Sequence, residues 1–346
     1  MKTLKRVLLF VIIMMLIIYN PKNYIIVSAT NTILKKPVKI GVFLHSYDEY
    51  LSLIKQNLEK IQQENKDEVE FTFFNAKENQ SIQNESINDA LEKDFDAFII
   101  NLHTINLNEV GDILSKVIKS NKPLILLGEP DEDLIDFIKY NGVFIASSGK
   151  DSGSLEGKII ADEWKNNKEN IDRNYDNTLQ YIVLQGRLGD PIVEQRTKYA
   201  ISTLKKAGIK TEELSSVNGE WNKDLAKKAI ESLFLIYGNR IEAIISNNDE
   251  MALGAIEALQ KYGYNNGNES MHIMVVGIDG IDKAKDLIEK GFMTGTVIQD
   301  PYAQAEALYK VSMNLVSEKY PLENTDYKFD DTGSVIRLPY KEYKKE

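Results

Sequence analysis

Short apolar runs alternate with amphipathic stretches along the chain from Val38 onward. The first series consists of VKIGVFL (38–44), EFTFF (70–74), DAFIINL (96–102), PLILLGE (123–129) and VFIAS (143–147). The second series consists of QYIVLQG (180–186), EAIISNN (242–248), HIMVVGID (272–279) and GTVIQD (295–300). Runs of this length are typical of buried β-strands. The segments between them, such as 50–63 and 224–236, have the apolar spacing of helices.

The alternation of strands and helices predicts an α/β fold with parallel sheets. Two series of strands in 346 residues indicate two doubly wound lobes. Ligands bind beyond the carboxyl ends of the strands in such sheets. The polar residues that follow the runs are therefore binding candidates: His45, Ser46, Asp48, Glu49, Asn101, Glu129, Asn247, Asn248, Asp249, Asp279, Gln299 and Asp300.

Each of these loops, taken alone, is equally compatible with an ordinary polar surface turn. Taken together they are rich in amides and carboxylates and almost devoid of Lys. Phosphate groups are bound by cations and helix N-termini, whereas sugar hydroxyls are bound by fixed amides, carboxylates and Arg. The loops therefore favour a sugar over a phosphorylated ligand.

The composition excludes several other classes of function. The formal net charge of -10 leaves no basic surface for phosphates, so we expect no nucleic-acid partner. Three His and no Cys argue against a His/Cys metal site and against thiol catalysis. The sequence also has no GxxxxGK[ST] nucleotide loop and no HExxH motif.

The N-terminal residues have the pattern of a secretion signal. The basic stretch MKTLKR (1–6) precedes the apolar run VLLFVIIMMLII (7–18), and the small residues VSA (27–29) follow. Twelve apolar residues suit the core of a signal peptide better than a membrane span, so we predict a signal peptide over residues 1–29. The alternative is an uncleaved anchor, because YIIV (24–27) extends the apolar character. Without Cys, no lipid-attachment site follows the run.

The segment DRNYDNTLQ (172–180) places oxygen-bearing side chains at every second position. This is the opening pattern of a calcium loop of the EF-hand kind. The bidentate Glu expected at the twelfth position is absent, because residue 183 is Val. The alternative interpretation is a solvated turn between a helix and a strand.

Several longer segments resemble one protein family. These are NNDEMALGAIEAL (247–259), VVGIDGIDKAKDLIEKGFMTGTVIQD (275–300), GRLGDPIVEQRTKY (186–199), the Tyr47-Asp48-Glu49 turn and VIRLPY (335–340). The chain resembles the periplasmic galactose/glucose-binding proteins, which are type I periplasmic sugar-binding proteins, from Lys39 to about Tyr340. The resemblance covers nearly the whole predicted mature chain and is more specific than any single motif.

The resemblance implies two lobes joined by three chain crossings, near Ala146–Ser147, Ile298–Pro301 and Asp330–Thr332. The N-terminal lobe would then comprise residues 36–146 and 301–330. The C-terminal lobe would comprise residues 147–298 and 331–346, including a strand around Val335–Leu338 and the calcium loop.

The resemblance also supplies the missing calcium ligand, Glu242, from a distant strand. The implied ligands are the side chains of Asp172, Asn174, Asp176 and Gln180, the carbonyl of Thr178 and both carboxylate oxygens of Glu242. These seven oxygens suit a hard cation with a structural role. Asn177 stands at the sharp turn where EF-hand-like loops have Gly, and Asn tolerates the positive φ that such a turn requires.

A sugar site is implied in the same way, residue by residue. Arg196 matches a forked donor to adjacent hydroxyls, Asn101, Asn248 and Asp279 match amide and carboxylate ligands, and Trp221 matches an aromatic that stacks on the sugar ring. Trp221 could alternatively be an ordinary packed aromatic. In the other lobe, Tyr50 matches the opposing aromatic, and either Asp48 or Glu49 matches the acid.

Three positions depart from the family pattern. Asp190 stands in place of His, Ile192 in place of Asp and Gln299 in place of Asn. The change at Ile192 matters most, because an apolar side chain cannot replace a hydrogen-bonding carboxylate, and an unpaired buried hydroxyl costs roughly 1–3 kcal/mol. We expect galactose or glucose as the ligand, with a pentose or a differently held hexose as the alternative.

The resemblance implies a binding protein that closes around a monosaccharide and delivers it to the membrane permease of an ABC transporter. A sensor that signals to the extracytoplasmic domain of a histidine kinase is the main alternative. It is suggested by the lack of a Cys for lipid anchoring, in a chain whose Ile, Lys and Asn usage resembles AT-rich Gram-positive bacteria. A glycosidase is a minor alternative, because the sequence singles out no pair of carboxyls for that chemistry.

Overall fold

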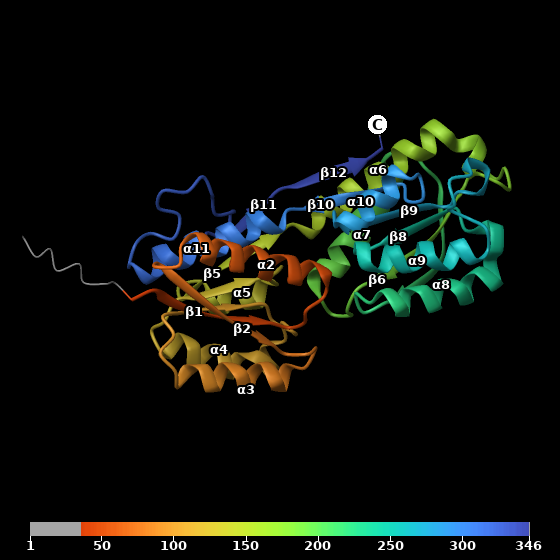
Figure 1. Cartoon of the computed structure of the whole chain (residues 1–346). Helices are drawn as coiled ribbons and strands as arrows, with labels where there is room; N and C mark the ends of the chain where they lie inside the picture. The colour runs from red at the N-terminus through yellow and green to blue at the C-terminus, as the bar shows by residue number, and fades with distance from the viewer. Residues whose placement is uncertain (1–35, 346) are drawn as a thin grey trace, which may run out of the picture. The chain divides into compact units, whose positions relative to one another are not determined.

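The computed structural model describes residues 36–345, and the predicted signal peptide or anchor at residues 1–29 lies outside the described residues. Within residues 36–345, no helix combines the length and the apolar character needed to cross a bilayer. The described chain forms two six-stranded sheets, each flanked by helices (Figure 1).

The first sheet is entirely parallel and has the strand order β11-β5-β4-β3-β1-β2. Its strands are β1 (Val38–Leu44), β2 (Val69–Asn75), β3 (Ala97–Ile100), β4 (Leu124–Leu127), β5 (Gly142–Ser147) and β11 (Val335–Leu338). The helices of this N-terminal lobe are α2 (Glu49–Glu64), α3 (Gln80–Leu91), α4 (Leu107–Lys119), α5 (Glu132–Ile138) and α11 (Pro301–Val316).

The second sheet has the order β12-β10-β9-β8-β6-β7, and β12 runs antiparallel to β10. Its strands are β6 (Leu179–Gln185), β7 (Thr211–Asn218), β8 (Ala243–Ser246), β9 (Met274–Asp279), β10 (Gly295–Gln299) and β12 (Tyr340–Lys344). The helices of this C-terminal lobe are α6 (Gly149–Ile171), α7 (Pro191–Lys206), α8 (Lys223–Tyr237), α9 (Asp249–Lys261) and α10 (Asp282–Glu289). Two short 3-10 turns, η1 (Gly238–Arg240) and η2 (Glu269–Met271), complete the lobe.

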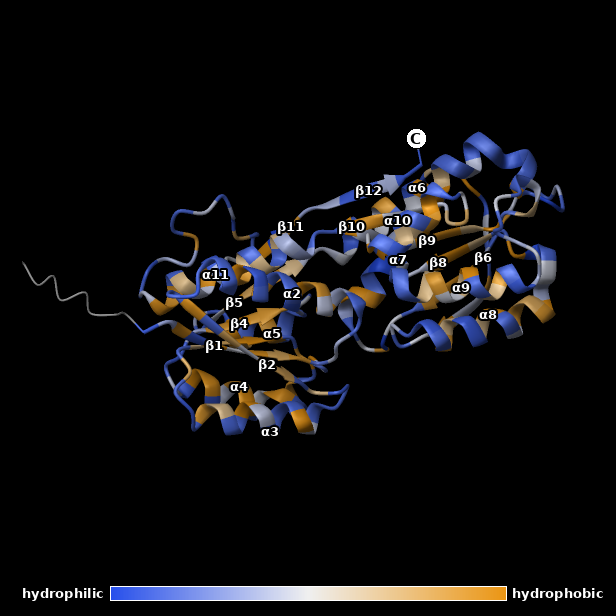
Figure 2. Cartoon of the chain, viewed as in Figure 1, coloured by the Kyte–Doolittle hydropathy of each residue, from blue (hydrophilic) through white to orange (hydrophobic). Residues whose placement is uncertain are grey.

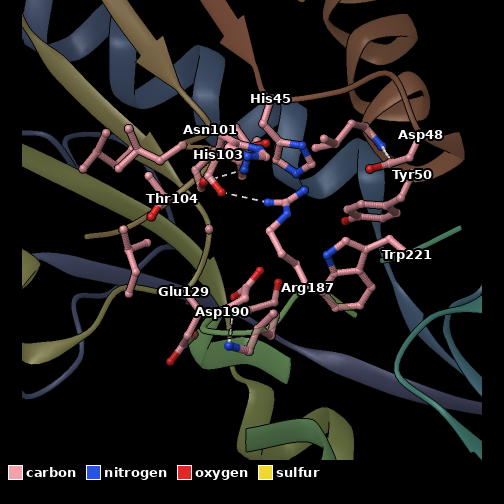
Figure 3. Close-up of a pocket in the computed structure, with 18 of the residues that line it drawn as sticks. His45, Asp48, Tyr50, Asn101, His103, Thr104, Glu129, Arg187, Asp190 and Trp221 are labelled. Atoms are coloured by element: carbon pink, nitrogen blue, oxygen red, sulfur yellow. Dashed lines mark hydrogen bonds between the residues drawn. The ribbon is translucent and has the colours of Figure 1, made fainter. Parts of the chain in front are cut away.

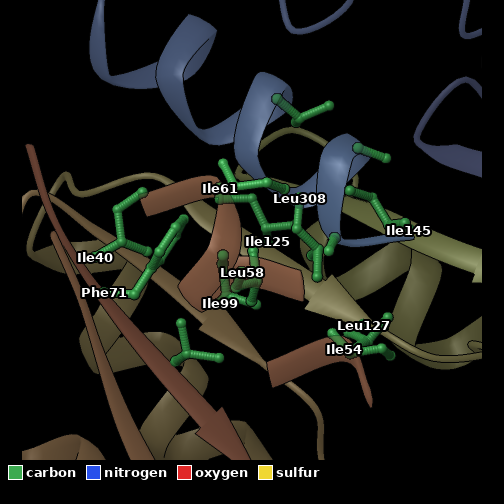
Figure 4. Packing of buried hydrophobic residues seen from close by; sticks show 14 of the residues in the cluster. Ile40, Ile54, Leu58, Ile61, Phe71, Ile99, Ile125, Leu127, Ile145 and Leu308 are labelled. Carbon is green, nitrogen blue, oxygen red and sulfur yellow. The ribbon is translucent and has the colours of Figure 1, made fainter. Parts of the chain in front are cut away.

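Helix α2 illustrates how apolar spacing assembles the N-terminal lobe. Its N-cap is Asp48, and its buried residues are Leu51, Ile54, Leu58 and Ile61, which recur every three or four positions and so lie on one face. This face packs with α11 against one side of the first sheet (Figure 4). Figure 2 shows the same principle in the second lobe, where β8 and β9 are hydrophobic and the helices carry one hydrophobic and one hydrophilic side.

The last part of the chain corrects the predicted lobe boundaries. Residues 335–338 were expected in the C-terminal lobe, but β11 pairs with β5 of the first sheet, with Val335 opposite Phe144 and Leu338 opposite Ser147. The third crossing therefore lies at Pro339, between β11 and β12, and not near Asp330–Thr332. Both Val335 and Ile336 are buried in the hydrophobic clusters of the N-terminal lobe, so β11 is part of its core.

The packing of α2 leads to a prediction for stability. Leu58 is fully buried, and Leu58→Ala should lower the free energy of unfolding of the N-terminal lobe by about 2–5 kcal/mol, because the lost contacts leave a cavity. Urea denaturation followed by circular dichroism measures this change. Leu235→Ala is the matched control, because Leu235 is 77% exposed and its loss should change stability by no more than about 0.5 kcal/mol. Equal effects of the two substitutions would contradict the assignment of Leu58 to the core.

Candidate functional site

A cavity of about 250 Å³ is lined by both lobes, at the carboxyl ends of strands from both sheets. Nine of the ten sugar-site residues expected from the sequence line it: Asp48, Tyr50, Asn101, Asp190, Arg196, Trp221, Asn248, Asp279 and Gln299. The tenth, Glu49, does not line this cavity. Its carboxylate instead pairs with Lys283 of the C-terminal lobe at 2.9 Å. Of the two alternatives in the first loop, the structure therefore places Asp48 at the site.

Arg196 is held rigidly at the C-terminal side of the cavity. Its Nη1 donates to the carbonyl oxygen of Asn247 at 2.6 Å, and its Nη2 donates to Gln299 Oε1 at 2.9 Å and to the Tyr340 hydroxyl at 3.2 Å. The side chain is only 4% exposed. Its Nε, also buried, has no hydrogen-bond partner among residues 36–345. The guanidinium is therefore fixed in place by three of its five N–H donors.

Two aromatic rings lie in the cavity, one from each lobe (Figure 3). The Tyr50 hydroxyl donates to Gln304 Oε1 at 3.0 Å, and Gln304 Nε2 in turn donates to Ser147 Oγ at 2.9 Å. The Trp221 ring packs so closely on Gly186 that a Cβ there would lie 2.2 Å from the ring. Both rings are thus held by their surroundings, and their apolar faces suit the C–H faces of a sugar.

Several buried polar atoms of the cavity have no hydrogen-bond partner among the described residues. They are Asn101 Oδ1, Arg196 Nε, His45 Nδ1 and His103 Nδ1. The Asn101 amide is oriented by its Nδ2, which donates to the carbonyl oxygen of Leu127 at 2.8 Å. Since nearly all buried polar groups in proteins are paired, the presence of four unpartnered atoms makes this cavity a candidate binding site.

The cavity carboxylates also serve as helix caps. Asp48 Oδ1 accepts from the Leu51 amide at 2.8 Å at the start of α2, and Asp190 Oδ1 accepts from the Ile192 amide at 3.1 Å at the start of α7. Burial raises the pKa of both carboxyls, although these hydrogen bonds act in the opposite direction. Burial also raises the pKa of Asp279 well above its usual range, against the lowering effect of the Arg196 charge.

Several lining residues were not expected from the sequence. His103, Thr104 and Gln304 lie in segments where no pattern marks them, although each lines the cavity. Arg187 stands in the segment that resembles the sugar-binding family, but its reach into the site is not evident from spacing. Its Nη1 donates to the carbonyl oxygen of His103 in the other lobe at 2.8 Å. Ile192 lines the cavity as an apolar residue, in keeping with its departure from the family pattern.

The segment expected to bind calcium lies apart from this cavity, between α6 and β6. The Asp172 carboxylate accepts from the amides of Asp176 at 3.1 Å and Asn177 at 3.0 Å, and Asp176 Oδ1 accepts from the Thr178 amide at 2.7 Å. Asn177 has a φ of 58°, so the positive φ expected at this turn is present. Glu242 Oε2 accepts from the Gln180 amide at 2.8 Å, which brings the distant carboxylate to the loop.

Three carboxylates crowd together at this loop, and the nearby cation, Lys168, lies 3.9 Å from Asp172 Oδ2. Burial is the main reason that the pKa of Glu242 rises to about 7, and the neighbouring carboxylates Asp172 and Asp176 raise it further. Glu242 Oε1 is buried and has no partner among residues 36–345. The side chains of Asn174 and Gln180 present their amide nitrogens to Asp176 Oδ2, at 2.9 and 3.3 Å.

No group of three or more His, Cys, Asp or Glu side chains in the described part of the chain is placed to hold a metal. The residues nevertheless fit a cation if the Asn174 and Gln180 amides rotate to present their oxygens. The unpartnered carboxylate oxygen of Glu242 is the observation in favour of such a fit.

The comparisons with known proteins agree with this architecture. A family model described as "Periplasmic binding protein domain" matches residues 40–319. The D-galactose/methyl-galactoside binding periplasmic protein MglB of Haemophilus influenzae is 33% identical over 305 residues, which cover 87% of this chain and 88% of that protein. A xylitol-binding protein of Mycolicibacterium smegmatis is 24% identical over 80% of this chain and 72% of its own length.

Solved structures show the same fold at lower identity. A solute-binding protein from Actinobacillus succinogenes with bound D-allose has a TM-score of 0.73 and 18% identity, covering 89% of this chain and 98% of its own. A solute-binding protein from Bacillus halodurans with bound myo-inositol has a TM-score of 0.72 and 22% identity, covering 89% of this chain and 95% of its own.

The contact between Gly186 and Trp221 gives a direct test of the site. Gly186→Ala should displace the Trp221 ring, because the added methyl group overlaps it, and the fluorescence emission of Trp221 should change. The chain has two Trp, so the experiment is made in a Trp164→Phe background. Gly111→Ala is the matched control, because a Cβ there meets no atom within 4 Å. Unchanged emission in Gly186→Ala would show that the ring is not held by this contact.

Proposed function

The chain belongs to the family of periplasmic binding protein domains, and from this premise we propose that it is an extracytoplasmic receptor for a monosaccharide of the galactose or glucose type. The receptor closes around one sugar and delivers it to the membrane permease of an ABC transporter. One observation carries the proposal: the cavity between the lobes combines two aromatic faces, Tyr50 and Trp221, with buried polar atoms that lack partners in the described chain. The family is one of binding proteins, so the protein is not an enzyme.

The residues of the cavity would contact a sugar in two ways, by stacking on its ring and by hydrogen bonding to its hydroxyls. Trp221 and Tyr50 offer apolar faces to the ring, whereas Arg196 Nε and Asn101 Oδ1 are a donor and an acceptor without a partner among residues 36–345. Asn248, Asp279 and Gln299 add further polar groups along the C-terminal wall. Support for a hexose comes from the relative named for D-galactose and methyl-galactoside. A pentose is the alternative ligand, because Ile192 removes one hydrogen-bonding group from the wall.

Closure follows from the contacts that a ligand makes with both lobes. Three polar contacts already cross between them: Arg187 to the His103 carbonyl at 2.8 Å, Lys283 to Glu49 at 2.9 Å and Gln195 to Glu129 at 3.3 Å. A sugar that bonds to groups of both lobes adds to these contacts only when the cleft is closed. The sugar shifts the equilibrium between the open and closed forms toward the closed one. The free energy of this shift is no larger than the difference between its binding free energies for the two forms.

Isothermal titration calorimetry of the purified protein with D-galactose, D-glucose and D-xylose tests the proposal. We expect one-to-one binding of at least one sugar, with a change in Trp221 fluorescence at saturation. Binding of none of the three by folded protein would contradict the proposed function, and preference for D-xylose would favour the pentose alternative.

Arg196 gives a sharper test of the same site. Arg196→Lys keeps the charge but loses the planar fork, so affinity for the best sugar should fall by about 10–100-fold. Arg240→Lys is the control, because Arg240 lies outside the cavity and pairs with Glu212 at half-exposed positions. A thermal unfolding curve for each variant separates a loss of affinity from a loss of fold. Equal affinities of the two variants would argue against Arg196 as a ligand.

We also propose that the loop formed by residues 172–180 together with Glu242 is a structural calcium site. When bound, the ion would neutralise the crowded carboxylates of Asp172, Asp176 and Glu242 and tie the loop to the start of β8. The unpartnered Glu242 Oε1 supports this proposal.

Calcium should therefore raise the melting temperature. The gain in stability is about 2.7 kcal/mol when free calcium is a hundred times its dissociation constant, and a chelator should reverse it. Glu242→Gln should abolish most of the gain. Glu269→Gln should not, because Glu269 is an exposed acid outside the loop. A calcium response that survives Glu242→Gln would place the ion elsewhere.

The permease and the sensor kinase remain alternative partners for the closed form. The permease is proposed because two of the solved structures that this chain resembles are solute-binding proteins of ABC transporters. Stimulation of ATP hydrolysis by a reconstituted permease would support transport, whereas a sugar-dependent change in the activity of a histidine kinase would support the sensor hypothesis.

A further inference from the structure

Arg187 is a half-buried cation that lines the cavity, and no carboxylate among residues 36–345 lies within hydrogen-bond distance of it. It follows β6 and lies among His45, His103 and Trp221 in the view of Figure 3. Among residues 36–345, its guanidinium makes one hydrogen bond, to the carbonyl oxygen of His103. The side chain is 17% exposed, and its contact with a carboxylate is an approach of Nε to Glu220 at 3.9 Å. Because Glu220 is 42% exposed, this pair contributes little.

The carboxylates that line the cavity are, by contrast, already engaged within the protein. Asp48 accepts from the Leu51 amide and from Ser46 Oγ, and Asp190 accepts from the Ile192 amide. Glu129 pairs with Arg337 Nη1 at 2.7 Å and accepts from Gln195. Glu109 accepts from Asn106 Nδ2 at 3.2 Å. Asp279 lies in the field of Arg196, which lowers its pKa against the effect of burial. Four of the five acids therefore have an internal hydrogen-bond partner, and the fifth, Asp279, lies near the Arg196 charge.

The surroundings of Arg187 also favour an acceptor in the ligand over a donor. A guanidinium offers only N–H groups, and its planar fork matches a carboxylate in a bidentate way. The partly buried imidazoles of His45 and His103 lie beside it (Figure 3), each with a buried Nδ1 that has no partner among the described residues. Burial, together with the charges of Arg187 and His103, lowers the pKa of His45 to about 3, so its ring adds no second cation to the site.

We propose that Arg187 is a specificity-determining residue that directs the cavity toward a sugar bearing a carboxylate, a hexuronic acid in preference to a neutral hexose. This inference rests on the proposed sugar-binding function and names the class of sugar. The carboxylate of the ligand pairs with the free edge of the Arg187 guanidinium. The hydroxyls of the same ring meet Arg196 and Asn101, and the ring itself lies against Trp221.

The test uses two matched pairs of ligands, D-galactose with D-galacturonate and D-glucose with D-glucuronate. The members of each pair differ only in the oxidation of C6. Calorimetry with the wild-type protein should give at least about tenfold tighter binding of the uronate in one pair. This advantage should shrink as salt is raised, because the new contact is between charges.

Variants of Arg187 then test whether this residue causes the preference for the uronate. Arg187→Gln should lower the uronate-to-hexose affinity ratio by about tenfold, and Arg187→Lys should retain part of that ratio because it keeps the charge. Arg240→Gln removes one positive charge outside the cavity and should leave the ratio unchanged. Thermal unfolding checks that each variant is folded.

The outcomes separate this inference from the function on which it rests. Binding of a hexose without any preference for its uronate would overturn the role of Arg187 and leave the proposed function standing. An equal loss of affinity for the hexose and for its uronate in Arg187→Gln would also overturn it, and would show that Arg187 only bridges the lobes through His103. Binding of none of the four sugars by folded protein would overturn both proposals.

Discussion

The buried guanidinium of Arg196 is the interaction on which the binding site depends. It joins the ends of three strands, through the Asn247 carbonyl after β8, Gln299 at the end of β10 and the Tyr340 hydroxyl of β12. The helix that carries it can approach α6 only because α6 has Gly where the two cross. A Cβ at Gly153 would lie 2.3 Å from the carbonyl oxygen of Arg196. Removing Arg196 would leave several buried acceptors unpaired. The position of Arg196 thus determines both the wall of the cavity and the close packing of α6 on α7.

Apolar patterning predicts most clearly the strands that are buried on both faces. The interior strands β3, β4, β8 and β9 are buried at every position and stand out as apolar runs. The edge strand β7, with the sequence TEELSSVN, has no such run and is not evident from the sequence. The edge strand β12, YKEYK, is hidden for the same reason. Since β11 and β12 are separated only by Pro339, VIRLPY reads as one segment in the sequence although its two parts belong to different sheets.

The residues of the site also fall into two groups, those that the sequence identifies and those that it does not. Asn101, Asn248 and Asp279 lie at or just beyond the ends of strands, and Asp48 lies in the loop after β1. Both their position near strand ends and the family resemblance therefore identify them. The pattern does not decide between Asp48 and Glu49, because one residue of register separates a helix cap from an exposed ion pair. Arg187 and His103 meet only because the lobes face each other, and no periodicity within one lobe predicts a contact between two. The alternating oxygens of 172–180 are evident in the sequence, but the orientation of the Asn174 and Gln180 amides is not.

Two acids of the cavity wall are also helix caps, and this explains how they are held rigidly. Asp48 and Asp190 come from opposite lobes, and each begins a helix whose first amides it satisfies. A helix N-terminus carries partial positive charge, which stabilises a carboxylate that burial would otherwise disfavour. Each acid is thereby fixed in position by its own lobe, and a sugar that bonds to both must bring the lobes to one separation. Selectivity then depends on which ligand has its oxygen atoms at positions that both walls can bind at that separation. Arg187, which contacts His103 of the other lobe, provides one of these positions in our proposal.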